Sequence, residues 1–405
     1  MTLILLYMLT VLSYAVLGIF LYLSVCTLYF VVIAIANGVQ KEPDYTVSSS
    51  KRKVAVFIPC YKEDTIILDT ARAAISHPYP TADFDVFVIA DSMRPETIER
   101  LRALPVHVIE VSFDVSSKSR SLNAALNCVD EARYDIAFVL DADNIMSPGT
   151  LEKVNHAFAQ GARAVQCRRI AKNLNTPVAL LECINEELNN VIFRQGQRSL
   201  GLSATCAGSG MAFEFGLLKA IFNQEAILHD TGEDKEIDLQ LLKMHVPVEY
   251  IAEAYIYDEK APDVQTLKKQ RLRWMEVHLK HMGRFLDRDM LALPMDRHLL
   301  NKLMHYLILP RSFFVALIVA VVAMGLVDAA VESTLLMPDI KWWTAVIGAY
   351  AIATFSFVPA RYMTKNTLMS LSRLPGIITS MVVNMFRVRL SRKEFLHTEK
   401  KFIQS

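Results

Sequence analysis

The N-terminal segment constrains the fold most, because no charged side chain precedes Lys41 and residues 2–36 are almost wholly apolar. About 20 apolar residues cross the hydrocarbon core of a bilayer, so this run suffices for one tilted helix with an overhang. It is short for two helices and a turn, although two spans stay open. A secretory signal peptide would have a basic start and a shorter apolar run. We predict one uncleaved membrane helix within residues 1–40, with a buried core helix as the alternative.

Two further apolar runs lie near the C-terminus, at about 310–331 and 342–360. The stretch 374–386 is too short to span and is followed by basic residues, which is typical of an amphipathic helix in the interface. Buried core helices are again the alternative. Residues 286–405 are therefore expected to form interfacial helices, two membrane helices, and an amphipathic C-terminal helix with a tail.

Basic residues near the apolar runs indicate the orientation. Lys51 and Arg52 follow the first run and Arg361 follows the last, whereas the connector 328–341 is mainly acidic. With three spans, the N-terminus lies outside and the middle of the chain lies in the cytosol. The chain is thus expected to be a multi-pass protein of the cell membrane.

Overall composition excludes two classes of protein. The chain has 405 residues, 53% of them hydrophobic, and a formal net charge of +1. Such an apolar, nearly neutral chain is not intrinsically disordered. It also lacks the excess positive charge that drives nucleic-acid binding. Its six cysteines are scattered without a CxxC pair, so no zinc site is expected.

Between residues 50 and 285 the pattern changes to short β-rich runs that alternate with helical stretches. The runs are VAVFIP at 54–59, DVFVIAD at 85–91, VHVIEV at 106–111 and IAFVLDAD at 136–143. This alternation predicts an α/β domain with a mostly parallel sheet and helices on both faces. Ligands of such sheets bind beyond the carboxyl ends of the strands, where polar residues are therefore of interest.

Two glycine-rich nucleotide-binding motifs are absent after the first strand. Neither GxGxxG nor GxxxxGK[ST] occurs there, which disfavours nicotinamide enzymes and P-loop NTPases. Asp141 and Asp143 instead form a DxD after the run at 136–143. Two carboxylates there suit Mg²⁺ or Mn²⁺ shared with substrate phosphates, although helix-cap chemistry is the alternative.

Two later motifs suit the same chemistry. Glu233 and Asp234 precede a helical pattern, where a carboxylate is either a general base or an N-terminal helix cap. Gln270, Arg273 and Trp274 share one side of a helix. Arg273 could bind a diphosphate and Trp274 could stack on a sugar or a base, whereas an interfacial aromatic belt is the alternative.

The ordered DxD, Glu-Asp and Q-x-x-R-W elements, between apolar runs, resemble the membrane-integrated family 2 glycosyltransferases, which include processive cellulose, hyaluronan, chitin and poly-N-acetylglucosamine synthases. The resemblance covers about Val54 to Phe285. It implies a nucleotide-sugar-binding domain of the GT-A type, flanked by transmembrane and interfacial helices. The implied activity is inverting, metal-dependent hexosyl transfer from a UDP-sugar to a growing β-linked polysaccharide.

The resemblance also implies a role for each matching residue. Asp234 is similar to the catalytic base, with Glu233 beside it, and Arg273 to the cation that stabilises the departing UDP. Asp143 is similar to the metal ligand, with Asp141 as donor-sugar contact and second ligand. The substrate-binding residues would include Tyr61, Glu63, Asp91, Lys118, Cys206, Gly208, Ser209, Gln270 and Trp274. The tail 395–400 is similar to a W-x-x-T-x-R/K ending, with Phe395 in place of Trp.

This sequence departs from the family pattern at three places. Lys62 stands where Asn is commoner, Ala90-Asp91-Ser92 replaces a D-D-G turn, and Gly is missing after Trp274. These departures affect the acceptor more than the fold. Three spans are also few for a polysaccharide channel, so an oligomer or a secretion partner could be required. The alternatives are a ceramide-glucosyltransferase-like enzyme that adds one sugar to a glycolipid, or an inactive regulatory subunit of a polymerase.

Two other groups of polar residues lie outside these motifs. His278 and His281 lie three residues apart without a supporting carboxylate pattern, so interfacial or solvated histidines are expected rather than a metal site. Arg168, Arg169 and Lys172 are expected to cover a solvated edge, with phosphate binding as the alternative.

Overall fold

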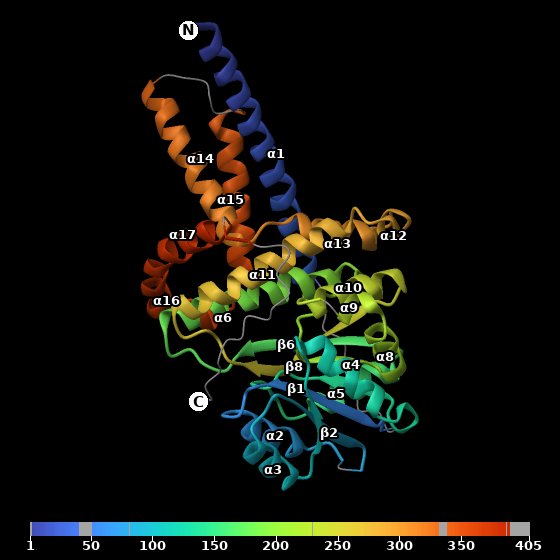
Figure 1. Cartoon of the computed structure of the whole chain (residues 1–405). Helices are drawn as coiled ribbons and strands as arrows, with labels where there is room; N and C mark the ends of the chain where they lie inside the picture. The colour runs from blue at the N-terminus through green and yellow to red at the C-terminus, as the bar shows by residue number, and fades with distance from the viewer. Residues whose placement is uncertain are drawn as a thin grey trace.

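The computed structural model describes residues 2–39, 51–80, 82–228, 230–331, 338–385 and 387–388. The predicted tail motif at 395–400 lies outside these residues. The N-terminal run forms one continuous helix, α1 (Thr2–Val39), that projects from an α/β body (Figure 1). The single N-terminal helix that the apolar run predicts is therefore present.

The body is built on one sheet of eight strands. The strands are β1 (Val54–Tyr61), β2 (Phe84–Asp91), β3 (His107–Val111), β4 (Ile136–Val139), β5 (Ile145–Met146), β6 (Ala164–Ala171), β7 (Met211–Glu214) and β8 (Val248–Asp258). Its helices are α2 (Ile67–Ile75), α3 (Pro95–Arg102), α4 (Lys118–Cys128), α5 (Thr150–Ala159), α6 (Pro177–Asn190), α7 (Gly196–Ser199), α8 (Phe215–Phe222), α9 (Glu225–Leu228) and α10 (Glu233–Lys243). A π-helical turn, η2 (Val191–Gln195), joins α6 to α7.

The sheet is mixed, with a majority of parallel pairings, as the sequence predicts, and three antiparallel pairings that it does not predict. Its order is β3-β2-β1-β4-β7-β6-β8-β5, and four of the seven pairings are parallel. β7 runs antiparallel to β4, with Met211 opposite Val139. Hydrophobic periodicity identifies strands but contains no information about which strands pair or in which direction. The start of β7 consequently lies beside the end of β4, where the predicted DxD follows.

Helices cover both faces of this sheet, and each face has its own core. Leu68 of α2 and Leu151 of α5 pack on one face with β1 and β4 residues. Leu122 of α4, Phe215 of α8 and Ile237 of α10 pack on the other. Because α4 and α10 share a face, the residues at their N-termini reach the same edge of the sheet.

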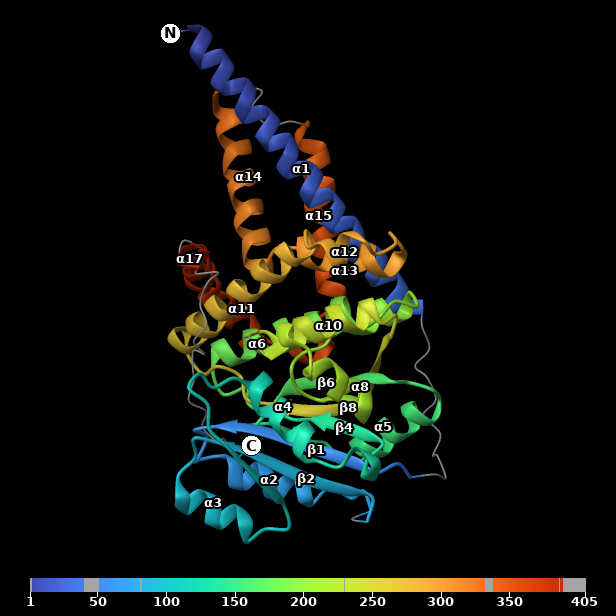
Figure 2. The same ribbon diagram turned by 45° about the vertical axis from the view of Figure 1, so that its right-hand side comes forward.

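The C-terminal part consists of helices above the body. They are α11 (Val264–Arg284), α12 (Arg288–Leu291), α13 (Arg297–Leu307), α14 (Arg311–Val331), α15 (Ile340–Ser356), α16 (Lys365–Ser370) and α17 (Leu374–Met385). Both ribbon views place α6, α10, α11 and α13 between the sheet and the projecting helices (Figures 1 and 2). These helices thus form a layer between the α/β body and the apolar part of the molecule.

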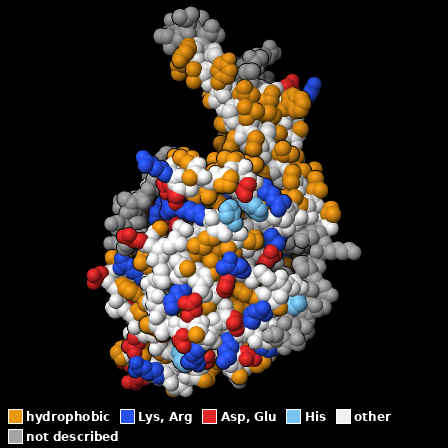
Figure 3. Space-filling view, turned by 90° about the vertical axis from the view of Figure 1, so that its right-hand side faces the viewer, with side chains coloured by type: hydrophobic (Ala, Val, Ile, Leu, Met, Phe, Trp, Pro, Cys, Tyr) orange, Lys and Arg blue, Asp and Glu red, His pale blue; other side chains and the backbone are white. Residues whose placement is uncertain are grey.

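The projecting helices α1, α14 and α15 meet through aromatic side chains. The rings of Phe30, Phe314 and Tyr350 lie 5.1–5.9 Å apart, centroid to centroid. On the face that Figure 3 shows, hydrophobic side chains cover much of this projection, whereas charged side chains are scattered over the body. Two segments, Thr10–Val39 and Arg311–Asp328, are long and apolar enough to cross a membrane. The predicted third span corresponds to α15, which has 17 residues and is shorter than an ordinary span.

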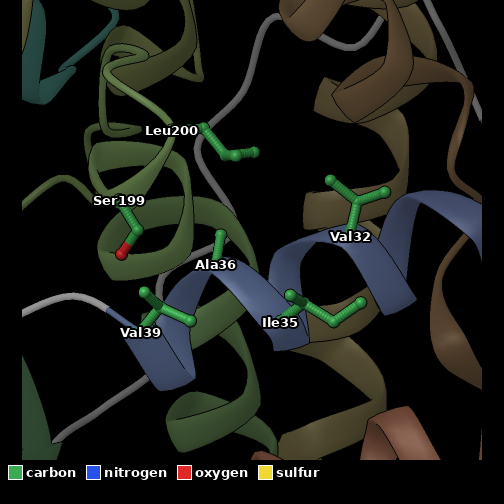
Figure 4. Close-up of a pocket in the computed structure, with 6 residues that line it drawn as sticks. All are labelled: Val32, Ile35, Ala36, Val39, Ser199 and Leu200. Atoms are coloured by element: carbon green, nitrogen blue, oxygen red, sulfur yellow. The ribbon is translucent and has the colours of Figure 1, made fainter.

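The foot of α1 packs closely on the body at Gly196. A Cβ atom there would lie 2.5 Å from Cγ2 of Ile33, so no larger residue fits without a shift. A cavity of about 460 Å³ opens beside this contact and is lined by Val32, Ile35, Ala36, Val39, Ser199 and Leu200 (Figure 4). None of the predicted site residues lines it, and its largely apolar lining offers no catalytic chemistry.

Candidate active site

The ends of β1 and β2 bring together two of the predicted nucleotide contacts. Tyr61 is the register partner of Asp91, so both lie at one edge of the sheet. Oδ1 of Asp91 accepts hydrogen bonds from Ser92 Oγ (2.8 Å) and Ser116 Oγ (3.1 Å). Its Oδ2 is buried and has no hydrogen-bond donor within the described residues. A buried acceptor of this kind is suited to an N–H or O–H group of a ligand.

Glu63 lies one turn beyond Tyr61, where its backbone carbonyl accepts from the amides of Ile66 and Ile67 at the start of α2. Lys62, with a φ of 55°, makes the turn between them, and its ammonium lies 5.0 Å from the centroid of the Tyr61 ring. Left-handed backbone is uncommon for a residue with a side chain. The turn therefore has a defined shape that presents Tyr61 and Glu63 next to Asp91.

The DxD follows β4 directly and is fixed by the neighbouring segment. Ser209 Oγ accepts from the backbone amide of Asp141 (2.9 Å) and from Asn144 Nδ2 (2.7 Å). Asp143 is 7% exposed, and its carbonyl accepts from Lys172 Nζ. The alternative of helix-cap chemistry is not observed directly after the DxD, since α5 starts at Thr150. Ser209 thus joins the DxD to the chain that enters β7.

Lys118, the first residue of α4, is the centre of the site. Its ammonium lies 2.5 Å from Oδ1 of Asp141, 2.5 Å from the carbonyl of Gly208 and 3.1 Å from Oε1 of Glu233. Gly208 has a φ of 82°, and a Cβ there would lie 3.8 Å from both Lys118 Nζ and Glu233 Oε1. Three predicted residues, from three separate segments, therefore converge on the ammonium of Lys118.

Two carboxylates, those of Asp141 and Glu233, share the single ammonium of Lys118, and the pKa values respond accordingly. Burial raises the pKa of Glu233; Asp234 and Asp141 add to this rise and Lys118 opposes it. Burial opposes the charged form of Lys118 too, but Asp141 and Glu233 outweigh it and raise its pKa. The site therefore keeps Lys118 positively charged and makes Glu233 a weaker acid than usual.

Asp234 follows Glu233 in the first turn of α10, and Gly232 precedes that helix. The Asp234 carboxylate accepts from the amide of Lys235 (2.9 Å). A Cβ on Gly232 would lie 2.2 Å from Cγ1 of Val277 in α11, so the glycine permits close approach of the two helices. The close contact of Gly232 with Val277 therefore sets how near Asp234 lies to α11.

The three residues of the Q-x-x-R-W element occupy the first half of α11. Arg273 is close enough to interact electrostatically with Glu233, Asp141 and Asp234, which oppose the lowering of its pKa by burial. Trp274 is 41% exposed, and the guanidinium of Arg271 lies 4.8 Å from its ring centroid. Gln270 is partly buried one turn before. Arg273 therefore joins the carboxylate cluster, whereas Trp274 offers an aromatic face at its edge.

Cys206 lies apart from this cluster. It is 1% exposed, and its backbone amide donates to Oδ1 of Asp238 in α10 (3.0 Å). Burial raises the pKa of its thiol well above the ordinary value, with Asp238 adding to the rise. The structure thus gives Cys206 a packing position beneath the site rather than a place on its surface. Asp238, one helical turn after Asp234, is the contact that the sequence did not reveal.

Arg168 and Arg169 are ion-paired rather than solvated, so that prediction was wrong. Each side chain is 17% exposed; Arg168 pairs with Glu187 and Arg169 with Asp258. Arg169 also donates to the carbonyl of Ala207 (2.6 Å), next to Gly208. Their partners lie far along the chain or in a different element, so alternation in the local sequence could not reveal them.

His281 likewise differs from the expectation of a solvated histidine, because it is fully buried. Its Nε2 lies 3.3 Å from Oδ2 of Asp230 and 3.8 Å from Oε2 of Glu236. The spacing of these three side chains would accept a metal ion. However, Lys280 already pairs with Asp230 and Arg284 with Glu236, both at 3.0 Å. We call the five side chains of Asp230, Glu236, Lys280, His281 and Arg284 the α10–α11 clamp.

Comparison with known proteins identifies the domain that carries the carboxylate cluster. The family model described as "Glycosyltransferase like family 2" matches residues 51–276. Two curated relatives are similar along most of the chain, and both are named N-acetylglucosaminyltransferase. The relative from Rhizobium leguminosarum bv. viciae is 23% identical over 76% of this chain and 72% of its own length. The relative from Rhizobium meliloti is 23% identical over 73% of this chain and 68% of its own.

Among solved structures, the mannosyltransferase PcManGT from Pyrobaculum calidifontis, in complex with GDP-Man and Mn²⁺, has the same overall fold. The TM-score is 0.59 at 16% identity, and the match covers 94% of this chain and 99% of that one. The GT-A-like α/β fold expected from the sequence is thus confirmed, apart from the direction of the strands noted above.

Proposed function

The chain belongs to glycosyltransferase family 2, and from this membership we propose that it is an inverting, metal-dependent membrane enzyme that transfers a hexosyl group from a UDP-sugar. The convergence of Asp141, Glu233 and Gly208 on the ammonium of Lys118 is the observation that carries the proposal. It supports a site in which carboxylates and cations surround one small reacting group.

The nucleotide would bind at the ends of β1 and β2. Oδ2 of Asp91 is buried and would accept the N–H of a uracil ring, while Tyr61 and Glu63 would contact the base beside it. Arg273 and Lys118 would contact the diphosphate, since both are cations at the carboxylate cluster. Trp274 would stack on the acceptor sugar, with Gln270 beside it.

Asp234 would act as the base. An acceptor hydroxyl attacks C1 of the donor sugar from the face opposite the UDP group, and the proton passes to the carboxylate. The bond between C1 and the diphosphate oxygen breaks, and UDP leaves with its electron pair. Arg273 and Lys118 stabilise the charge that develops on UDP. Glu233, beside the base, holds Lys118 in place for this step.

The DxD suits a divalent cation. Asp141 and Asp143 are oxygen ligands at the end of a strand, and Asp141 already lies against one cation, the ammonium of Lys118. Asp143, with Asp141, would hold Mg²⁺ or Mn²⁺, which supplies positive charge at the diphosphate. The remaining positive charge comes from the chain itself, through Lys118 and Arg273.

Two relatives named N-acetylglucosaminyltransferase make UDP-N-acetylglucosamine the first donor to test. The acceptor is either a growing β-linked polysaccharide, as the sequence resemblance implies, or a single glycolipid. The ring contacts among Phe30, Phe314 and Tyr350 favour the glycolipid, because they close the space between the apolar helices of one copy. Extension of a polymer would then need an oligomer or a secretion partner.

We further propose that α1 and α14 cross the cell membrane, with the N-terminus outside and the catalytic domain in the cytosol. Their length and apolar composition support this. The layer of α6, α11 and α13 would lie at the interface with the lipid head groups. The active site would then lie within reach of acceptors held in the bilayer.

The test is release of UDP by the purified full-length protein in detergent, with Mn²⁺ and a panel of UDP-sugars, and GDP-mannose as the control donor. Release from one UDP-sugar, loss of release with a chelator, and recovery with Mn²⁺ or Mg²⁺ are expected. A product of one added sugar supports the glycolipid, whereas a ladder supports a polymer. No release from any donor, with release restored by a partner protein, would favour the regulatory subunit.

A further inference from the structure

Arg311, the first residue of α14, stands at the boundary between the apolar helices and the layer below them. Its guanidinium donates to the backbone carbonyl of Asn185 (3.0 Å), to Oδ1 of Asn185 (2.6 Å) and to Oδ1 of Asn189 (2.7 Å). The segment that follows, as far as Asp328, is apolar enough to cross a membrane. A permanent cation therefore lies partly buried where the lipid head groups would begin.

Arg311 is held by amide oxygens and not by an ion pair. Amide oxygens accept hydrogen bonds without carrying a charge, and within the described residues no carboxylate lies within ion-pair distance of Arg311. Glu182 and Glu186 of α6 interact with it electrostatically at longer range, as does Arg271. Arg271, in contrast, is held by both carboxylate oxygens of Glu182, at 2.6 and 2.7 Å. Burial of a charge without an ion-pair partner is costly, so Arg311 is suited to an anionic ligand.

The side chains that hold these two arginines share one face of α6. Glu182, Asn185 and Asn189 are spaced three and four residues apart, which places them on adjacent turns of the same side. Arg271 in turn lies on the ring of Trp274, the aromatic residue at the edge of the active site. A continuous row of polar contacts thus leads from Trp274 to Arg311 at the foot of α14.

We propose that Arg311 binds the phosphate of a lipid-linked sugar, and that this lipid is the acceptor. The inference rests on the proposed glycosyl transfer and specifies its acceptor. Guanidinium groups bind phosphate oxygens through paired hydrogen bonds, and basic pockets between membrane helices bind charged head groups. The lipid chain lies along α14 in the bilayer, and the sugar extends from the phosphate toward Trp274.

The transfer then balances as follows. A hydroxyl oxygen of the lipid-linked sugar forms a bond to C1 of the donor sugar, and the C1–O bond to UDP breaks. UDP leaves with the electron pair, and Asp234 receives the hydroxyl proton. The phosphate held by Arg311 takes no part in bond making. Arg311 is therefore a residue for acceptor binding and specificity.

The experiment measures two rates in nanodiscs of phosphatidylcholine with the full-length protein. One is UDP release without an acceptor, and the other is sugar transfer to a polyprenyl-diphosphate-linked sugar or to the same sugar on an uncharged polyprenyl chain. Arg311→Gln and Arg311→Lys are compared with Arg297→Gln, which removes an exposed arginine at the start of α13. Asn189→Asp supplies Arg311 with a carboxylate of its own and leaves the arginine unchanged.

Wild-type protein should transfer to the phosphate-bearing acceptor and much less to the uncharged one. Arg311→Gln and Asn189→Asp should each raise the acceptor KM roughly tenfold or more, since each removes a charge-assisted contact. Arg311→Lys should be intermediate, because it keeps the charge but loses the paired geometry. UDP release without acceptor should be unchanged in all variants, and Arg297→Gln should match wild type.

Other outcomes have distinct meanings. Equal transfer to both acceptors, or an unchanged acceptor KM in Arg311→Gln and Asn189→Asp, would overturn the inference while leaving the glycosyltransferase intact. Inhibition of all variants alike by inorganic phosphate would place the phosphate contact at the donor site instead, which also overturns it. Absence of UDP release by the wild type would instead contradict the proposed function itself.

Discussion

The two sides of α10 carry the same kinds of charged group in different proportions. The first turn presents Glu233 and Asp234 to the active site, where Asp141 and Asp143 add further carboxylates around Lys118 and Arg273. One turn further, Glu236 faces α11 in the clamp. There, with Asp230, it meets Lys280, Arg284 and the buried ring of His281.

The difference lies in the balance of charge. In the clamp each carboxylate has its own cation at 3.0 Å, so the group is complete without a ligand. Around Lys118 in the active site, two carboxylates share one cation, and the pKa of Glu233 is raised. A surplus of carboxylates is suited to a metal ion and a transferable proton. One helix can therefore position a catalytic group with its first turn and anchor itself with the next.

The largest effect is expected from Asp234→Asn. If the carboxylates of the active site perform the chemistry, loss of the base Asp234 should lower the rate of sugar transfer roughly 10²- to 10⁴-fold. Binding of UDP, measured by calorimetry, should persist because the nucleotide contacts lie at β1 and β2. Near-full turnover by this variant would show that Asp234 is not the base.

Lys118→Met should have the next largest effect, because it removes the cation that Asp141 and Glu233 share. Lys118 opposes the rise in the pKa of Glu233, so its removal raises that pKa further and protonates Glu233 at a higher pH. Turnover should fall roughly tenfold or more because a cation at the departing UDP is lost, and the ionisation of Glu233 in the pH profile should move to higher pH. An unchanged pH profile would mean that Lys118 and Glu233 are not coupled in the working enzyme.

Gly232→Ala tests whether the two sides of α10 are mechanically linked. The new methyl would collide with Val277, which should cost about 1–3 kcal/mol of stability and displace Asp234. The double variant Gly232→Ala/Val277→Ala restores the space and should recover much of the melting temperature and the turnover. If the double variant were no better than the single one, helix contact would not set the position of the base.

Asp230→Asn should have the smallest effect on turnover. Its main effect should be on the stability of the protein, to which the clamp contributes. Burial opposes its ionised form, but His281 and Lys280 lower its pKa from 3.8 to about 2. That pKa difference adds about 2 kcal/mol to the free energy of unfolding. The contribution is present above pH 3.8 and is lost as the pH falls through about 2. The variant should melt lower at neutral pH, with the gap closing in acid. A gap independent of pH would show that the carboxylate charge is not what stabilises the clamp.

The first four strands were predicted within a few residues, because each is a short apolar run that ends in polar residues. The strands at 164–171, 211–214 and 248–258 were not identified, and the antiparallel direction of β7 followed only from the structure. The reason is that local alternation marks a strand but not its neighbours. The stretch 374–386, predicted as an amphipathic helix in the interface, contains the helix α17 (Leu374–Met385), and its interfacial position stays a prediction.

The candidate site was predicted best where its residues stand in short motifs. Asp141, Glu233 and Lys118 lie together as the resemblance implies, but Cys206 is packed away from the surface. The contact of Asp230 with His281 and the contact of Arg311 with Asn185 were not predicted. Each of these pairs is a contact over 50 residues or more, and a polar residue in a helix gives no local sign of such a partner.

Composition and short-range periodicity were enough to predict which segments are apolar enough for a bilayer, that the middle is an α/β domain, and which carboxylates follow its strands. Which charges have an ion-pair partner of their own depends on the tertiary structure. Glu236 and Arg271 look no different along the chain from Glu233 and Arg311, yet α11 and α6 supply the first two with an ion pair each. Glu233 instead shares the ammonium of Lys118 with Asp141, and Arg311 is held by amide oxygens. Charge balance is a property of side chains gathered from distant segments, and it separates the anchoring groups from those that await a ligand.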